Sequence, residues 1–270
     1  TLIYFNGYYY LSFSEQGSGN DRIVHYRYTQ SLDQGWTIPE QDFFDGWGFY
    51  AGRIENVEGR LVLSGWVATK TIDKDYGDYM WGGHLVHHEL IQTESGQLFP
   101  KVMTEFDEFM SHEVSYDIQE TNTTFEDDTY TFSQSKGYSY LLFEELLSKP
   151  TKTVFEVDIT NSTNFGITLG AYQSSVGGLN YYFDLEHNRM EFYNVDSNLI
   201  SNAVPEISIP FDYTGITHLQ VTMITEGSVV VVYVNDQIAM TSRAYDMEGS
   251  YFGFFTFQSQ ATLSNLHFYE

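Results

Sequence analysis

Apolar and polar residues alternate with a period of two along most of the chain, in short segments separated by tight turns. Such alternation is typical of half-buried strands, and dipeptides such as Asn6-Gly7 and Ser95-Gly96 are suited to returning the chain on itself. The first part of the chain is therefore predicted to form antiparallel hairpins. Its predicted strands are Leu2–Phe5, Tyr8–Ser14, Arg22–Tyr28, Phe49–Glu55, Arg60–Ala68, Gly83–Gln92 and Gln97–Phe99.

The pattern loosens over Glu105–Ser111, which is predicted to be a short connector, and strand-like segments resume beyond it. Their number suits a two-sheet sandwich of the jelly-roll type. One segment, Tyr138–Leu147, fits a helix as well as a strand, and Pro150 ends it in either case. The other predicted strands are Thr121–Ser133, Thr153–Thr160, Phe165–Tyr172, Asn180–Leu185, Arg189–Asn194, His218–Thr225, Ser228–Val234, Gln237–Ser242, Tyr251–Phe257 and Thr262–Tyr269.

Aromatic residues are frequent in this chain and basic residues are rare. Aromatics make up 17% of the 270 residues, with 22 Tyr and 21 Phe, beside 22 Gly and 5 Pro. Tyr and Phe favour pleated strands and Gly supplies turns, so the fold class is predicted to be all-β. The 12 Lys and Arg against 37 Asp and Glu give a formal net charge of −25. Such a charge repels phosphate backbones and anionic lipids, which argues against nucleic acid or a membrane as partner.

The sequence offers little metal or cofactor chemistry. It contains no cysteine, which excludes disulfides, thiolate metal sites and a cysteine nucleophile. The histidines and glutamate of His84–Glu89 would share a face on a helix, but their flanks predict a strand that points them to both faces. The acidic stretches Asp73–Asp78 and Glu126–Asp128 lack the bidentate glutamate of a calcium loop and are predicted to be solvated. No metal ion and no cofactor is predicted.

Apolar runs such as Val229–Val234 are too short to cross a bilayer. The sequence therefore predicts a soluble protein and leaves the cytoplasm and the cell exterior open as compartments. The chain opens with the strand-like residues Thr1–Phe5 and no signal segment. We expect either that processing removed such a segment or that the chain begins within a longer protein.

Three segments resemble glycoside hydrolase family 32, the family of invertases, inulinases and levanases. The first, Asp45–Ala51, is similar to the family's Asp-x-Gly…Phe-Tyr-Ala stretch, and a hairpin ending in Ser64-Gly65-Trp66 follows it. The second, Trp81–Leu98, is similar to Trp-x-Gly…Pro-Arg-Glu-Leu…Asp-Gly-x-Leu, with His87-His88 in place of Pro-Arg. The third, Glu226–Arg243, resembles the family's closing strands. Their order and spacing extend over nearly the whole chain.

The resemblance implies a five-bladed β-propeller followed by a jelly-roll-like β-sandwich. Residues 1–105 would be the C-terminal blades of the propeller and residues 112–270 the β-sandwich domain, so the chain would hold only part of the propeller. The family's nucleophile, its transition-state-stabilising Asp and its acid/base Glu all come from earlier blades. The acid/base Glu would lie in a Glu-x-Pro motif a few residues before Thr1. The resemblance thus implies that this chain alone is inactive and that the missing blades, in the same or a companion chain, are its partner.

The resemblance also implies an activity, the retaining hydrolysis of β-fructofuranosyl linkages in sucrose or fructans. Retaining hydrolysis needs two carboxyl groups roughly 5–5.5 Å apart, one as nucleophile and one as acid. No such pair stands out in this sequence. The alternative is a non-catalytic carbohydrate-binding or structural β module, because an acidic surface rich in aromatics also suits carbohydrate docking.

Five residues are candidates for contact with the sugar substrate. In the family, aromatic side chains at the positions matching Tyr50 and Trp66 line the fructose pocket, and aromatic faces stack on the apolar C–H faces of sugars. The alternative for both is packing between blades. Asp45, in an aromatic and Gly-rich turn, is a candidate for a hydroxyl contact, with capping of its own turn as the alternative. Phe49 and Trp81 complete the set, with a place in the propeller core as the alternative.

Overall fold

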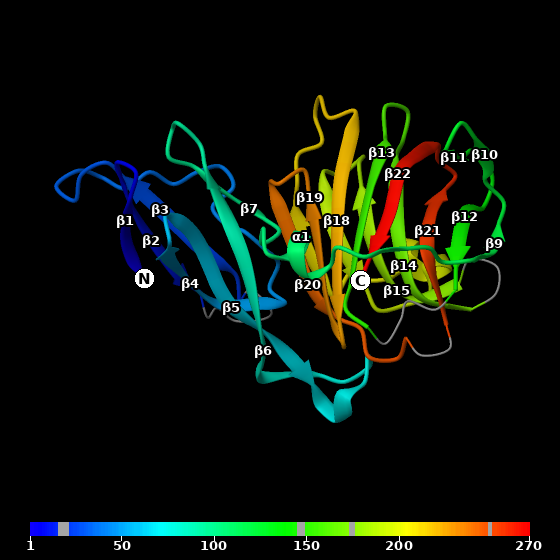
Figure 1. Ribbon diagram of the computed structural model, residues 1–270, viewed down its shortest axis with the longest axis horizontal. Coiled ribbons are helices and arrows are strands. Elements are labelled where there is room, and N and C mark those ends of the chain that lie inside the picture. Colours follow the sequence, from blue (N-terminus) through cyan, green and yellow to red (C-terminus); the bar gives the residue numbers. More distant parts are fainter. Residues whose placement is uncertain (16–21, 145–148, 173–175, 248–249) are drawn as a thin grey trace.

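Antiparallel strands form nearly all of the regular structure, which confirms the predicted all-β class (Figure 1). Within the described residues the strands make four sheets, two small ones in the first part of the chain and two large ones in the second. The computed structural model describes residues 1–15, 22–144, 149–172, 176–247 and 250–270.

The two small sheets come from the hairpins that the alternation predicts. Their strands are β1 (Leu2–Phe5), β2 (Tyr8–Ser14), β3 (Val24–Thr29), β4 (Phe49–Val57), β5 (Arg60–Lys70), β6 (Tyr79–Gln92) and β7 (Leu98–Lys101). The first sheet has the order β1-β2-β3 and the second the order β4-β5-β6-β7, with the short helix η1 (Thr71–Asp73) between β5 and β6. Asn6 and Gly7 adopt φ angles of 42° and 91°, as the two-residue turn between β1 and β2 requires.

A one-turn helix, α1 (Phe106–Phe109), lies in the predicted connector, and the strands of the sandwich follow it. These are β8 (Glu113–Val114), β9 (Ile118–Thr121), β10 (Thr124–Glu126), β11 (Thr129–Phe132), β12 (Tyr138–Phe143), β13 (Thr151–Asp158), β14 (Asn164–Tyr172), β15 (Val176–Asp184), β16 (Arg189–Tyr193), β17 (Ile207–Pro210), β18 (His218–Glu226), β19 (Val229–Val234), β20 (Ile238–Arg243), β21 (Tyr251–Phe257) and β22 (Ala261–Tyr269), with helix η2 (Ser197–Asn202) after β16. One sheet has the order β10-β11-β22-β13-β18-β19-β20, with β8 beside β22. The other has the order β17-β16-β15-β14-β21-β12-β9. No helix in the described ranges is long and apolar enough to cross a membrane.

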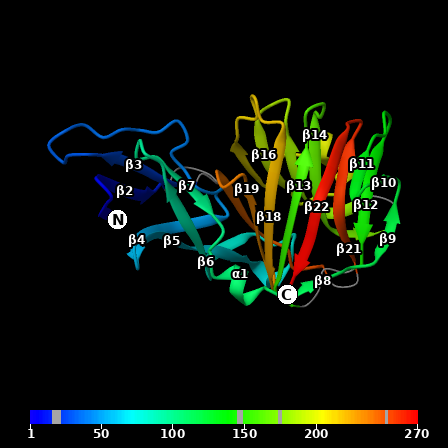
Figure 2. The same ribbon diagram turned by 45° about the horizontal axis from the view of Figure 1, so that its top comes forward.

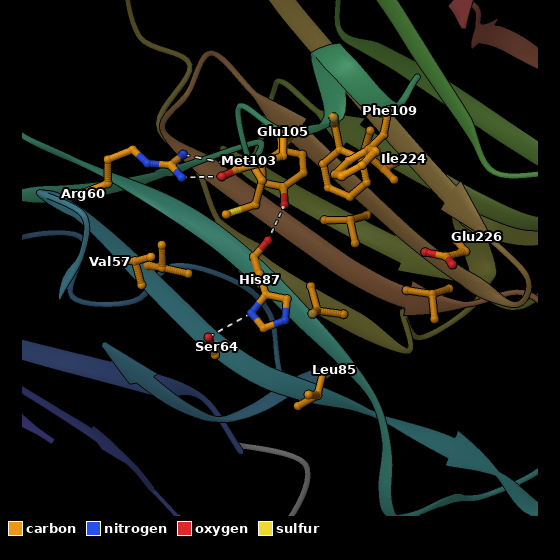
Figure 3. A pocket seen from close by; sticks show the side chains of 16 residues that line it. Val57, Arg60, Ser64, Leu85, His87, Met103, Glu105, Phe109, Ile224 and Glu226 are labelled. Carbon is orange, nitrogen blue, oxygen red and sulfur yellow. Dashed lines mark hydrogen bonds and ion pairs between the residues drawn. The ribbon is translucent and has the colours of Figure 1, made fainter. Parts of the chain in front are cut away.

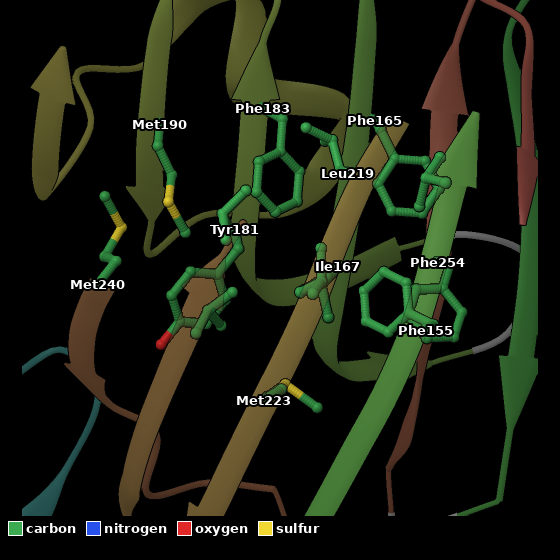
Figure 4. Packing of buried hydrophobic residues seen from close by; sticks show 14 of the residues in the cluster. Phe155, Phe165, Ile167, Tyr181, Phe183, Met190, Leu219, Met223, Met240 and Phe254 are labelled. Carbon is green, nitrogen blue, oxygen red and sulfur yellow. The ribbon is translucent and has the colours of Figure 1, made fainter. Parts of the chain in front are cut away.

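The core of the sandwich is built from the inward-facing residues of both large sheets (Figure 4). Phe155 on β13 and Met223 on β18 come from one sheet, and Ile167 on β14 and Phe254 on β21 come from the other. All four side chains are fully buried. The rings of Phe155 and Phe254 meet between the layers with centroids 4.7 Å apart. The inward positions recur at every second residue, which is the period of the sequence pattern.

Two details of the sequence prediction change. The segment Thr121–Ser133, predicted as one strand, contains the hairpin of β10 and β11, because Asp127 and Asp128 adopt φ angles of 49° and 57° between them. Aspartate tolerates this left-handed conformation better than most residues, so the acidic stretch is a tight turn. Tyr138–Phe143 is a strand paired with β21 and β9, which excludes the helix alternative over these residues. Residues 145–148 lie outside the described ranges.

The small sheets join the sandwich through one outer face of it (Figure 2). A single apolar cluster connects Phe49 and Leu63 of the second small sheet with Val231 and Tyr233 of β19. These two residues of β19 point away from the sandwich core, which contains their neighbours along the strand. The sandwich that the sequence predicts is therefore present, with small sheets packed against it. The number of propeller blades and the division at residues 105 and 112 stay predictions.

Candidate functional site

Three of the predicted sugar-contact residues form one aromatic surface on the second small sheet. Tyr50 on β4 lies directly opposite Trp66 on β5, and Trp81 on β6 contacts both. The ring centroids are 5.3 Å apart for Tyr50 and Trp66, 5.7 Å for Tyr50 and Trp81, and 6.1 Å for Trp66 and Trp81. Tyr50 and Trp66 are partly exposed, and Trp81 is 62% exposed. We call these three residues the aromatic surface.

A β-bulge shapes this end of β4. The register with β5 shifts between Tyr50 and Arg53, and Ala51 adopts a φ angle of 56°. Glycine is required next to it, because a Cβ atom at Gly52 would come within 2.8 Å of Leu63. Bulges redirect the side chains of the bulged strand. The Tyr-Ala-Gly stretch of the sequence is thus the local signal that places Tyr50 across from Trp66.

Arg22 joins the aromatic surface, although the sequence analysis did not single it out. Its guanidinium carbon lies 4.8 Å from the ring centroid of Trp81 and 5.8 Å from that of Tyr50. Cation–π attraction favours this position. One basic residue just before a strand is a weak signal, so sequence reasoning had little to find it by. The surface combines aromatic faces with a cation, and these side chains do not include the carboxylate pair that glycoside hydrolysis requires.

Phe49 and Asp45 lie inside the protein, which corrects the expectation that they contact a sugar. Phe49 is 1% exposed, and its ring packs on that of His88 with centroids 4.7 Å apart. Asp45 is 2% exposed, and its Oδ1 accepts hydrogen bonds from the backbone N–H groups of Gly46 at 2.6 Å and Thr241 at 2.8 Å. Asp45 therefore caps its own turn, which was the alternative to a hydroxyl contact, and it also binds β20.

Asp45 is the centre of a buried polar network between the second small sheet and the sandwich. Its Oδ2 accepts a hydrogen bond from the Thr241 hydroxyl and lies 3.1 Å from Nε2 of His88, an ion-pair distance without hydrogen-bond geometry. Nδ1 of His88 lies 2.9 Å from the Tyr233 hydroxyl. Burial, assisted by the Asp45 carboxylate, raises the pKa of Tyr233 well above its ordinary value. Since the side chains of Asp45 and His88 are fully buried, this network holds the two parts of the protein together.

A cleft of about 540 Å³ lies between the second small sheet and the sandwich, next to α1 (Figure 3). Leu85 and His87 line it on the side of β6, and Ile224 and Glu226 line it on the side of β18. Most of its other lining side chains are apolar: Val57, Val62, Val86, Met103, Phe106, Phe109, Val229 and Val231. The aromatic surface does not line this cleft, so the two features are separate.

The three histidines of β6 have separate partners. Nδ1 of His84 lies 2.9 Å from Nη2 of Arg243, and Nδ1 of His87 lies 2.8 Å from Oγ of Ser64. His88 belongs to the buried network described above. Over the described part of the chain, no group of histidine, aspartate and glutamate side chains is arranged to hold a metal ion.

Glu89 anchors β6 to the segment that leads to α1. Its carboxylate lies 2.9 Å from Nη1 of Arg60 and 3.1 Å from Nζ of Lys101, and it accepts a hydrogen bond from the Thr104 hydroxyl at 2.8 Å. Burial raises the pKa of Glu89, but Thr104 and Lys101 outweigh burial and the net pKa is lowered. A carboxyl group whose pKa is lower in the folded state stabilises the folded protein at pH values above its unfolded-state pKa. This stabilisation is lost as the pH falls through the folded-state pKa.

We therefore expect Glu89→Gln to lower the free energy of unfolding by about 1 kcal/mol at neutral pH. The difference from the parent chain should vanish once the pH is below the folded-state pKa of Glu89. Urea unfolding over a series of pH values measures this, with Glu55→Gln as a control, because Glu55 is exposed on β4. A difference that stays constant with pH would contradict the assignment.

Comparison with known proteins gives a likeness of fold. No family model and no curated protein matches the sequence. Among solved structures, a sucrose-6-phosphate hydrolase from Lactobacillus gasseri matches with a TM-score of 0.65 and 14% identity. A glycoside hydrolase family 32 β-fructofuranosidase from Bombyx mori has 0.63 and 15%, and an exo-inulinase from Aspergillus awamori has 0.63 and 12%. The hydrolase and the β-fructofuranosidase each match over 100% of this chain, and the exo-inulinase matches over 97% of it. Each match covers 53% of the other protein's chain.

The chain thus spans about half the length of the solved structures that it matches. At identities this low, the matches show that the fold is shared. The matched structures include a member of glycoside hydrolase family 32, the family that the sequence motifs resemble. The chain has the fold of about half of such a protein, consistent with the C-terminal half to which the motifs correspond.

Proposed function

We propose that this chain is the C-terminal half of a retaining glycoside hydrolase that acts on β-fructofuranosyl linkages in sucrose or fructans. The observation that carries the proposal is the match of the whole chain, or nearly the whole chain, to about half of a β-fructofuranosidase, of an exo-inulinase and of a sucrose-6-phosphate hydrolase. The order of the three sequence motifs along the chain agrees with this proposal.

The catalytic carboxylates in this proposal belong to blades outside the chain, and residues 1–105 supply the last blades of the ring. The exposed face of the first small sheet supports this, because Leu2 and Tyr4 of β1 are 54% and 57% exposed there. Apolar side chains gathered on one sheet face suit contact with a further sheet. Residues 112–270 would form the sandwich that supports the blades. The complete protein then contains both halves, and residues 1–270 alone are inactive.

The aromatic surface is the part of the sugar site that this chain contributes. The rings of Trp66 and Trp81 offer apolar faces for the C–H face of a fructosyl unit, and Tyr50 adds a hydroxyl at the edge. Arg22 offers donors to the sugar oxygens from beside the Trp81 ring. Asp45 and Phe49 have no part in this site because they are buried.

Trp66→Ala, made in the protein encoded by the complete gene, should lower kcat/KM for sucrose and for inulin by about tenfold or more. A tenfold loss corresponds to about 1.4 kcal/mol of transition-state stabilisation, which a lost aromatic contact accounts for. Trp81→Ala should act in the same direction, and its exposed position makes it the safer variant for folding.

Tyr76→Ala is the matched control, since Tyr76 is 76% exposed in the loop between η1 and β6. Its kinetics should equal those of the parent protein. Unchanged kcat/KM in both tryptophan variants would contradict the placement of the sugar. Binding of fructans without any hydrolysis by the complete protein would favour the carbohydrate-binding alternative.

A further inference from the structure

The sandwich has two outer faces, and the small sheets cover only one of them. The covered face belongs to β18, β19 and β20, whose outward residues are in the cluster shared with the small sheets. The other outer face, formed by β12, β21, β14, β15 and β16, lies on the opposite side of the sandwich. A sheet face that only meets water is expected to carry polar side chains at its outward positions.

Aromatic side chains occupy this second outer face instead. The core positions of these strands include Leu141, Phe254, Tyr181 and Phe192. The outward positions, which alternate with them, hold Tyr138 on β12, Phe255 and Phe257 on β21, Tyr182 on β15 and Tyr193 on β16. The rings contact one another between strands. The centroid of Tyr138 is 4.9 Å from Phe257 and 5.9 Å from Phe255, and that of Tyr182 is 6.3 Å from Tyr193.

Phe255 forms the floor of this aromatic face. A Cβ atom at Gly166 on β14 would lie 2.3 Å from the Phe255 ring, so the ring rests on the glycine backbone. The ring is nearly parallel to that of Tyr182, with an angle of 22° and centroids 6.4 Å apart. Phe255 is 1% exposed, whereas Tyr138 and Tyr182 are partly exposed on either side of it. The result is a buried floor between two partly exposed walls.

These rings and the helix η2 enclose a pocket of about 440 Å³. The Tyr138 hydroxyl donates a hydrogen bond of 2.6 Å to the carbonyl of Ser197, which fixes η2 against the wall. Polar groups at the rim come from Asp184, His187 and Ser201. The carboxylate of Asp184 lies 2.8 Å from Nδ1 of His187, whose side chain is 72% exposed.

The charges around this pocket limit the class of ligand that it can bind. The residues that line the pocket include no lysine and no arginine, and the chain as a whole has a net charge of −25. An anionic ligand would therefore meet repulsion without a compensating cation. A neutral ligand with apolar faces and many hydroxyls fits both the aromatic walls and the carboxylate, imidazole and hydroxyl groups of the rim.

We propose that the pocket lined by Tyr138, Tyr182 and Phe255 is a second carbohydrate site, which binds a neutral oligosaccharide. Its volume lies in the range of about 300–1,000 Å³ that is usual for small-ligand pockets. The site shares no residue with the aromatic surface formed by Tyr50, Trp66 and Trp81. It therefore does not rest on the proposed hydrolase function, and it gives the sandwich a binding role of its own.

Isothermal titration calorimetry of the full chain with short neutral oligosaccharides of fructose, of glucose and of xylose, each tested alone, examines this proposal. Ser201→Trp places a bulky ring in the pocket from an exposed position on η2 and should weaken binding by about tenfold or more. Tyr182→Ala removes one wall and should do the same. Asn202→Trp is the matched control, because Asn202 is exposed on the same helix and does not line the pocket.

The proposal is supported if at least one oligosaccharide binds the parent chain and Asn202→Trp equally well but binds Ser201→Trp and Tyr182→Ala weakly. It is overturned if none of the three oligosaccharides binds the parent chain, or if binding survives Ser201→Trp. Binding that is lost only in Trp66→Ala also overturns it, while supporting the proposed function. Circular dichroism checks folding, and if Tyr182→Ala fails to fold, Ser201→Trp decides the matter alone.

Discussion

Replacing Asp45 with alanine is expected to lower the free energy of unfolding by about 4 kcal/mol. The Asp45 carboxylate accepts hydrogen bonds from the N–H groups of Gly46 and Thr241 and faces Nε2 of His88 at 3.1 Å. Alanine would leave these donors buried without an acceptor, whereas water serves them in the unfolded chain. Because Asp45 precedes β4 and Thr241 lies on β20, the hydrogen bonds that are lost are ones that join the small sheets to the sandwich.

Urea unfolding followed by tryptophan fluorescence measures this loss. Asp33→Ala is the control, since Asp33 is exposed and its removal should change the unfolding free energy little. Asp45→Asn keeps one acceptor oxygen and should fall between the two. Equal unfolding midpoints for Asp45→Ala and Asp33→Ala would show that the buried network does not hold the junction.

Arg243→Ala is expected to cost about 3 kcal/mol of unfolding free energy. Arg243 is fully buried, and its Nε donates to the carbonyl of Ala68 at 2.9 Å while its Nη2 donates to that of Val67 at 2.8 Å. Its Nη1 donates to the Ser228 hydroxyl at 2.8 Å. Burial lowers the pKa of Arg243, but the ordinary value is so high that the guanidinium stays charged. Alanine would leave two carbonyls of β5 without these donors and open a cavity.

Arg243→Lys tests the geometry of this contact, because a single ammonium group cannot reproduce the fork of the guanidinium. Its loss should be smaller than that of alanine but clearly measurable. Arg53→Ala, at an exposed position of β4, should behave like the parent chain in the same thermal or urea unfolding experiment. An Arg243→Ala variant with the stability of Arg53→Ala would contradict the anchoring role.

Local pattern predicts most of the fold, because a strand with one buried face repeats every second residue. It fails where a contact is set from far away in the sequence. Asp75 was predicted to be a solvated acidic residue, but its carboxylate accepts hydrogen bonds from the N–H groups of Tyr245 at 2.8 Å and Asp246 at 3.0 Å. Burial accordingly raises the pKa of Asp75. The edge strand β17 was missed because it is short and ends in Pro210.

The motifs that carry the family resemblance have a physical explanation in the structure. Asp45 from the first motif binds Thr241 from the third, and Arg243 from the third binds the strand that follows the first. These residues hold the junction between the small sheets and the sandwich. The motifs that carry the resemblance are therefore evidence for the fold more than for the sugar site. The resemblance singles out Tyr50 and Trp66, but the β-bulge between Tyr50 and Arg53, which the alternating pattern does not predict, sets them opposite each other. Arg22 and the outer aromatic face of the sandwich depend on packing that local pattern does not encode.

Release of fructose from sucrose by two proteins at equal concentration tests the central claim most directly. One is the protein encoded by the complete gene, and the other is residues 1–270 alone. We expect fructose from the complete protein and none from the isolated chain, because our proposal assigns the nucleophile and the acid/base group to blades outside it. Hydrolysis by the isolated chain at the rate of the complete protein, or no hydrolysis by the complete protein, would contradict this account.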